Sequence, residues 1–163
     1  MDKKRKPTRL QGYDYSQNGA YFVTICTYRR AQILSHIVGQ GFAPAQTQLS
    51  VYGKIVEHQL LNLEKRYTNI KIDKYVIMPN HLHVIFLLEN TSAGASPCPT
   101  LSDVVCTFKS LTTLLCKQAH PIEKVFQNSF HDHIIRNETD YLEIWQYIDN
   151  NPVKWQEDRF YCQ

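Results

Sequence analysis

The chain has 163 residues, 43% hydrophobic and 20% charged, which suits one globular domain with a buried core. No apolar run approaches the roughly 18 residues of a membrane span, and the basic start lacks the apolar stretch of a secretory signal. Five widely spaced cysteines without a C-x-x-C pair argue against a disulfide framework and a zinc ribbon, and favour a reduced, cytoplasmic compartment.

The net charge of +3 is unevenly distributed. Residues 1–30 hold seven basic against two acidic residues, whereas the remainder is slightly acidic. We therefore expect a basic N-terminal arm (residues 1–12) ahead of a single domain (residues 13–163). The arm favours a polyanionic partner, and the alternative is a solvated tail without a partner.

The first half of the chain predicts a strand, an excursion and a helix. Residues 21–28, "YFVTICTY", alternate in the manner of a strand. Residues 39–48 are expected to form a loop or hairpin excursion. From residue 50 to about 66, apolar side chains recur at helical spacing.

Two further strands are predicted at residues 70–78 and 81–89, joined by a turn at Pro79-Asn80. The segment 90–100 is small, polar and rich in proline, so we expect a mobile linker.

The last third predicts two helices around one strand. Thr100, with Asp103 three residues later, is a plausible capping box for a helix. Residues 125–136 can form a fourth strand, and Asn137 can cap a last helix over 138–150. This order predicts an α+β, ferredoxin-like split βαβ fold, an antiparallel sheet with helices on one face and a C-terminal helix. The other face would be free for chemistry.

The strand at 81–89 carries two histidines, His81 and His83, one residue apart. Side chains alternate in a strand, so both should lie on the open face, while the intervening aliphatic residues pack under the helices. Two imidazoles at this separation can converge on one divalent ion, with a third ligand from elsewhere. The alternative is a pair of half-exposed histidines without a ligand.

The last helix offers a nucleophile. With an apolar stripe centred on Tyr141, Trp145 and Ile148, Tyr141 should be core and Tyr147 should lie about 120° away, displayed. Asn151 projects in the same direction one turn later. A displayed tyrosine beside a two-histidine metal site can attack a phosphodiester polarised by the metal. The alternative is a surface tyrosine near a helix end.

Several sequence blocks resemble one known family. They are "RLQGYDYSQNGAYFVTICTYRR", "YVIMPNHLHVIF", "FKSLTT", "DHIIRNETDY" and "YIDNNPVKW". In this order they are similar to the REP-associated tyrosine transposases, single-tyrosine transposases of the HUH endonuclease superfamily. The resemblance runs from about residue 9 to residue 155.

The resemblance implies roles for four residues. His81 and His83 match the metal-binding pair, Tyr147 matches the catalytic tyrosine, and Asn151 matches the polar residue that completes the metal site. The implied reaction is Mg²⁺- or Mn²⁺-dependent cleavage of single-stranded DNA at hairpins such as repetitive extragenic palindromes. A 5′-phosphotyrosine intermediate is then rejoined by a 3′-hydroxyl. The implied oligomeric state is a monomer or a homodimer.

Candidate DNA contacts are basic or aromatic. They are Arg5, Lys6, Arg9, Tyr13, Arg29, Arg30, Lys109 and Arg136. A second His-x-His pair, His131 and His133, has no assigned role. It could approach the metal, position DNA, or be partly exposed strand histidines.

Two alternatives remain open from the sequence. One is a hairpin-binding module of the same fold that no longer cleaves DNA. The other is a small zinc hydrolase using His81, His83 and either His131 or His133, which would leave Tyr147 without a role.

Overall fold

A computed structural model describes residues 10–39, 44–89 and 99–162 of the chain. The predicted arm residues 1–9 and most of the predicted linker lie outside these ranges. The helices and strands are β1 (Gly19–Cys26), η1 (Tyr28–Arg30), β2 (Ser35–Val38), β3 (Gln46–Leu49), α1 (Val51–Leu61), α2 (Leu63–Arg66), β4 (Ile70–Met78), β5 (His81–Leu88), α3 (Leu101–Ala119), β6 (His131–Ile135), α4 (Glu138–Asn150) and η2 (Trp155–Glu157).

The main sheet has four strands in the order β4-β5-β1-β6. Every neighbouring pair is antiparallel. With α1 following β1 and α3 following β5, this is the split βαβ arrangement, so the predicted fold class is confirmed. The predicted capping box of α3 is present, with Thr100 and Asp103 bonded reciprocally.

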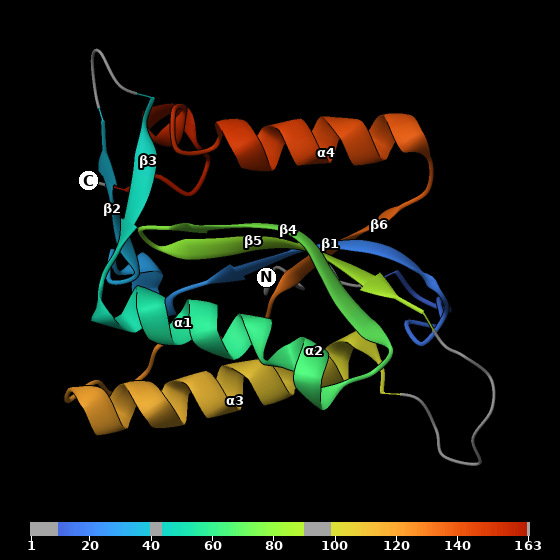
Figure 1. Cartoon of the computed structure of the whole chain (residues 1–163), viewed down its shortest axis with the longest axis horizontal. Coiled ribbons are helices and arrows are strands. Elements are labelled where there is room, and N and C mark those ends of the chain that lie inside the picture. Colours follow the sequence, from blue (N-terminus) through green and yellow to red (C-terminus); the bar gives the residue numbers. More distant parts are fainter. Residues whose placement is uncertain (1–9, 40–43, 90–98, 163) are drawn as a thin grey trace, which may run out of the picture.

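The helices lie on both sides of the sheet. α1 and α3 cover one face and α4 lies against the other (Figure 1). Beneath α1 and α3, the predicted inward residues of β5 are buried in the core, and these are Leu82, Val84, Phe86 and Leu88. The expectation that the other face is free is wrong, because α4 and the C-terminal segment cover it. No helix of the described ranges is long and apolar enough to cross a bilayer.

The predicted strand at 125–136 is shorter than expected. Only His131–Ile135 form β6. The preceding segment contributes a single bridge between Phe126 and Thr27, and its apolar side chains Val125, Phe126 and Phe130 fill the core from a loop. The buried apolar residues of this loop were therefore mistaken for part of a strand in the sequence.

The excursion predicted at 39–48 belongs to a hairpin. β2 and β3 form a separate two-stranded sheet. Each strand has four residues, and β3 is largely polar, so neither produces a clear periodic signal. Residues 40–43 of the excursion lie outside the described ranges.

Helix α1 depends on a close approach at Gly53. Ser50 caps the helix by accepting a hydrogen bond from Gly53 N, and a Cβ at Gly53 would lie 2.0 Å from the carbonyl oxygen of Leu34. We expect Gly53→Ala to lower the free energy of unfolding by about 3 kcal/mol, measured by urea denaturation. Gly19→Ala is the control, because a Cβ there meets atoms only at 3.7 Å or beyond. Equal effects of the two substitutions would contradict the steric explanation.

Candidate active site

The two histidines of β5 lie on the sheet face opposite α1 and α3. Both are fully buried, and their ring centroids are 4.4 Å apart. The covering side chains come from the C-terminal segment, with Trp155 5.9 Å and Phe160 4.7 Å from the His81 ring. The predicted face is therefore occupied by both imidazoles, but it is enclosed rather than open.

Hydrogen bonds orient the two imidazoles. His81 Nδ1 lies 2.9 Å from Asn80 Oδ1, and Asn80 Nδ2 donates to the carbonyl of Phe160. Because the Asn80 oxygen can only accept, His81 carries its proton on Nδ1 and keeps the lone pair of Nε2 free. His83 Nδ1 lies 2.8 Å from Thr24 Oγ1, which can donate or accept. Such partners fix the ring orientation of metal-binding histidines.

Burial keeps both imidazoles neutral. It lowers the pKa of His81 to about 4, against a smaller opposing effect of the Asp158 charge. The pKa of His83 is held well below its usual value by burial, and then by His81 and Arg159. Neutral imidazole is the form that binds metal ions.

Helix α4 brings Tyr147 to the histidines. Its hydroxyl lies 3.3 Å from His83 Nε2 and donates to Asp158 Oδ2 at 3.1 Å. The side chain is 39% exposed, in line with the predicted displayed position. Burial, followed by the charge of Asp158, raises the pKa of Tyr147 to about 12, so the Tyr147 hydroxyl keeps its proton at neutral pH.

Contacts with β4 hold α4 against the sheet. Tyr141, predicted to be core, is half-buried instead and donates its hydroxyl to Asp73 at 2.7 Å. Lys74 Nζ lies 3.6 Å from the Trp145 ring centroid and pairs with Asp149 at 2.8 Å. The expected stripe therefore faces the polar edge of β4, where a register shift occurs between Ile72 and Lys74.

Asn151 lies one turn after Tyr147 and is 2% exposed. Its Nδ2 donates to Asp158 Oδ2 at 2.7 Å. Its Oδ1 and the Nε2 of His81 are both buried without a hydrogen bond of normal geometry, although a weaker contact between the two side chains raises the pKa of His81 against the larger effect of burial. An unpaired buried polar atom costs roughly 1–3 kcal/mol, so two of them at one site indicate a place for a ligand.

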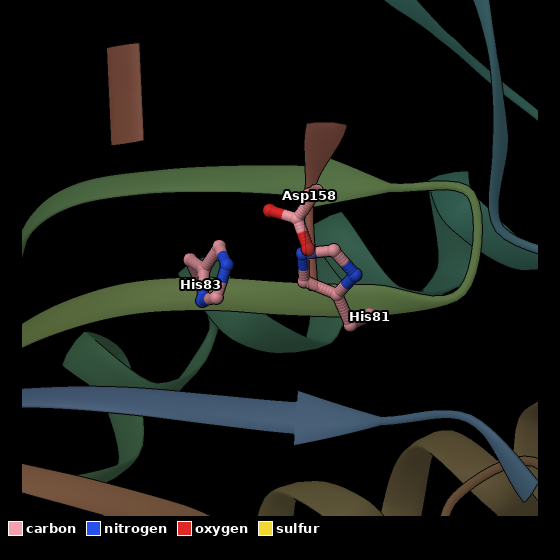
Figure 2. Close-up of side chains that lie close together, drawn as sticks. All are labelled: His81, His83 and Asp158. Atoms are coloured by element: carbon pink, nitrogen blue, oxygen red, sulfur yellow. The ribbon is translucent and has the colours of Figure 1, made fainter. Parts of the chain in front are cut away.

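Asp158 is a site residue that sequence reasoning missed. One ligand atom each of His81, His83 and Asp158 lie within 4.8 Å of one another. Figure 2 shows the Asp158 carboxylate directed towards the two imidazoles. Two neutral imidazoles, a carboxylate and an amide oxygen suit a divalent cation. No periodicity marks Asp158, which follows the short turn η2.

Two predicted DNA contacts, Tyr13 and Lys109, have partners within the protein. The hydroxyl of Tyr13 lies 3.2 Å from that of Tyr21, and its ring packs against the core. Lys109 donates to the backbone carbonyls of Gln127 and Asn128 at 2.5 and 2.8 Å. A role of either residue in DNA binding stays a prediction.

The other predicted contacts divide between exposed and undescribed residues. Arg29, Arg30 and Arg136 are exposed. Arg29 and Arg30 both have a φ of 55°, an uncommon conformation outside glycine. Arg5, Lys6 and Arg9 lie outside the described ranges.

Strand β1 lies between the second histidine pair, on β6, and the histidines of the metal cluster, on β5. His131 pairs with Thr24 and His133 with Phe22 on β1, whereas His83 pairs with Thr24 from β5 on the other side. Two strand spacings, roughly 9.6 Å, therefore separate His131 from His83. Within the described ranges, the metal cluster includes neither His131 nor His133, so the zinc-hydrolase alternative lacks its third histidine ligand.

Comparisons with known proteins identify relatives of the whole chain. No family model matches it. It is 33% identical to an uncharacterized protein of Haemophilus influenzae, over 96% of this chain and 93% of that protein.

Two solved structures are similar. One is a REP-associated tyrosine transposase bound to a REP hairpin, with a TM-score of 0.64 and 23% identity over 95% of this chain and 74% of that chain. The other is a putative transposase from Deinococcus radiodurans, with a TM-score of 0.52 and 19% identity over 92% and 97%. The chain thus belongs to the same family as the Haemophilus protein and has the fold of the REP-associated tyrosine transposase, as the resemblance of its sequence blocks predicted.

Proposed function

We propose that this chain is a metal-dependent single-stranded DNA endonuclease and strand transferase, a tyrosine transposase of the HUH type. The observation that carries the proposal is the Tyr147 hydroxyl, 3.3 Å from a histidine of the His81, His83 and Asp158 cluster. A similar fold is bound to a REP hairpin, which supports hairpin DNA as the partner. Four cysteines in the described ranges are free thiols, as is usual in a reducing compartment, and we propose a cytoplasmic location.

The residues present fit a divalent cation. His81, His83 and Asp158 would hold it, and the unpaired Oδ1 of Asn151 is a fourth candidate ligand. Oxygen and imidazole ligands suit Mg²⁺ or Mn²⁺, which we propose as the cofactor. When bound, the ion would polarise the scissile phosphodiester and stabilise charge on its oxygens.

Tyr147 is the proposed nucleophile. Its hydroxyl oxygen attacks phosphorus, the bond from phosphorus to the 3′-oxygen breaks, and a 5′-phosphotyrosine forms. The hydroxyl proton is donated to Asp158 Oδ2 in this structure, so that oxygen is a near acceptor for it. The released strand leaves as a 3′-hydroxyl after protonation. Attack by another 3′-hydroxyl on the phosphotyrosine rejoins DNA and restores the phenol.

Tyr147 lies at the proposed metal cluster of its own chain. Tyr147 contacts His83 of the same chain. The contacts of Tyr141 with Asp73 and of Lys74 with Asp149 hold α4 in that position. We therefore propose the monomer, rather than a homodimer that exchanges its helices, as the active form.

The test is covalent capture of DNA. Labelled hairpin oligonucleotides with single-stranded extensions, taken from repeats flanking the gene, are incubated with the protein and Mn²⁺, Mg²⁺ or EDTA. Denaturing protein gels are expected to show a labelled adduct with a metal ion and none with EDTA. A gel shift without any adduct would instead support a module that binds hairpins without cleaving them.

A further inference from the structure

A hollow of about 440 Å³ lies beside the catalytic residues. Its lining includes Phe22 and Thr24 of β1 and the histidine pair of β6. Arg30, Asp132 and the segment at Arg159 and Phe160 complete the lining. The hollow thus uses the second His-x-His pair, which the proposed chemistry leaves without a role.

The hollow borders the proposed active site, and Arg159 lines both this hollow and the cavity at Tyr147 and Asp158. Thr24, in its lining, is bonded to His83 Nδ1 at 2.8 Å. The Phe22 ring lies 5.2 Å from the His83 ring and 6.1 Å from the Tyr147 ring. The hollow therefore lies next to the place where Tyr147 would attack a phosphate.

The lining has an excess of positive charge. It carries the guanidinium groups of Arg30 and Arg159 against one carboxylate, Asp132. Neither arginine forms an ion pair within the described ranges. Arg30 donates to the backbone carbonyl of Arg159 at 3.2 Å, and both guanidinium groups lie within 5.2 Å of the Phe160 ring centroid. Two guanidinium groups that line one hollow without acidic partners are suited to a phosphate group.

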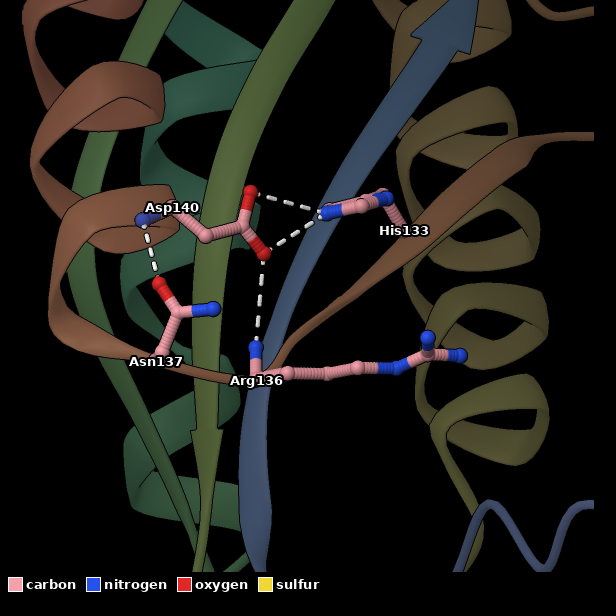
Figure 3. Close-up of polar contacts among 4 residues, drawn as sticks. All are labelled: His133, Arg136, Asn137 and Asp140. Atoms are coloured by element: carbon pink, nitrogen blue, oxygen red, sulfur yellow. Dashed lines mark hydrogen bonds and ion pairs between the residues drawn. The ribbon is translucent and has the colours of Figure 1, made fainter.

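Hydrogen bonds to Asp140 fix one edge of the hollow. Asp140 at the start of α4 holds His133 Nε2 at 2.8 Å and the backbone N of Arg136 at 3.3 Å (Figure 3). The Arg136 side chain extends away from this carboxylate. The rim of β6 is thereby tied to the helix that carries Tyr147, while His131 is exposed in the lining.

We propose that this hollow binds the nucleotide next to the scissile phosphate, with its own phosphate on Arg30 and Arg159 and its base against Phe22. This subsite rests on the proposed function, because it presupposes a single-stranded extension crossing the active site. Stacking on an aromatic ring tolerates any base, so the hollow would hold the strand without reading its sequence.

The test compares two DNAs. Anisotropy titrations use the Tyr147→Phe protein, which lacks the proposed nucleophile, with a blunt hairpin and with the same hairpin extended across the cleavage site. Adding Arg30→Gln and Arg159→Gln is expected to weaken binding of the extended hairpin at least about 10-fold. The log–log salt slope should fall by about 0.7 for each lost phosphate contact on a single strand. Affinity for the blunt hairpin should change less than about 2-fold.

Matched variants complete the design. Arg66→Gln, an exposed arginine of α2 beyond the other face of the sheet, should leave both affinities unchanged. Arg159→Lys, which keeps the charge, should retain most of the affinity for the extended hairpin. Equal losses on both DNAs, or no loss on the extended one, would overturn the subsite. These titrations need no cleavage. A loss of affinity for the extended hairpin alone would therefore support the subsite even if the wild-type protein forms no adduct. An adduct with the wild-type protein, without such a loss in the arginine variants, would refute the subsite but not the proposed function.

Discussion

Tyr147→Phe is expected to abolish the covalent DNA adduct and to lower strand cleavage at least about 10³-fold, the scale on which loss of a nucleophile acts. The substitution removes only the hydroxyl, which contacts His83 and Asp158, and leaves the ring against Phe22. Hairpin affinity should therefore change less than about 2-fold. Adduct formation on denaturing gels and hairpin binding by anisotropy measure the two quantities.

Tyr141→Phe is the matched control for this prediction. Tyr141 is on the same helix, but its hydroxyl bonds Asp73 rather than the metal cluster. The variant should keep the adduct, with at most a small loss of stability. Cleavage that survives Tyr147→Phe, or that is lost equally in the control, would rule out Tyr147 as the nucleophile.

His83→Ala is expected to lower affinity for Mn²⁺ at least about 100-fold, since even the loss of a residue that only orients a metal ligand costs 10- to 100-fold. The substitution removes one of the three clustered ligands and one of the two contacts of the Tyr147 hydroxyl. Calorimetric titration of Mn²⁺ into the DNA-free protein measures this loss independently of cleavage. Metal-dependent adduct formation should disappear together with the binding.

His133→Ala is the control for the metal site. His133 is on the same strand as His131, outside the cluster, and is bonded to Asp140. It should leave the Mn²⁺ affinity within about 2-fold of the wild-type value. If His83→Ala bound Mn²⁺ as tightly as the wild-type protein, the ion would have to be held elsewhere and the proposed cluster would be wrong.

The fold was predictable because its strongest signals are local. The alternation in β5 separated the core residues from His81 and His83, and the predicted cap residues Thr100 and Asn137 mark the starts of two helices. The spacing of Tyr147 and Asn151 likewise follows from one turn of helix. These features depend on neighbours within a few residues.

What the sequence did not reveal depends on tertiary packing. Nothing local to the C-terminal segment indicates that Phe160 covers His81 or that Asp158 joins the metal cluster. The carbonyl partners of Lys109 are 18 and 19 residues away in the chain, so its partial burial could not be anticipated. Tyr141 was placed in the core because helical periodicity does not tell which surface a stripe meets.

The most direct measurement is mass spectrometry of the adduct after proteolysis and nuclease digestion. The expected peptide contains Tyr147 and carries a nucleotide joined through its 5′-phosphate, and it forms only when Mn²⁺ or Mg²⁺ is present. A nucleotide on a different residue, such as Tyr141, or a linkage through a 3′-phosphate would contradict the proposed chemistry.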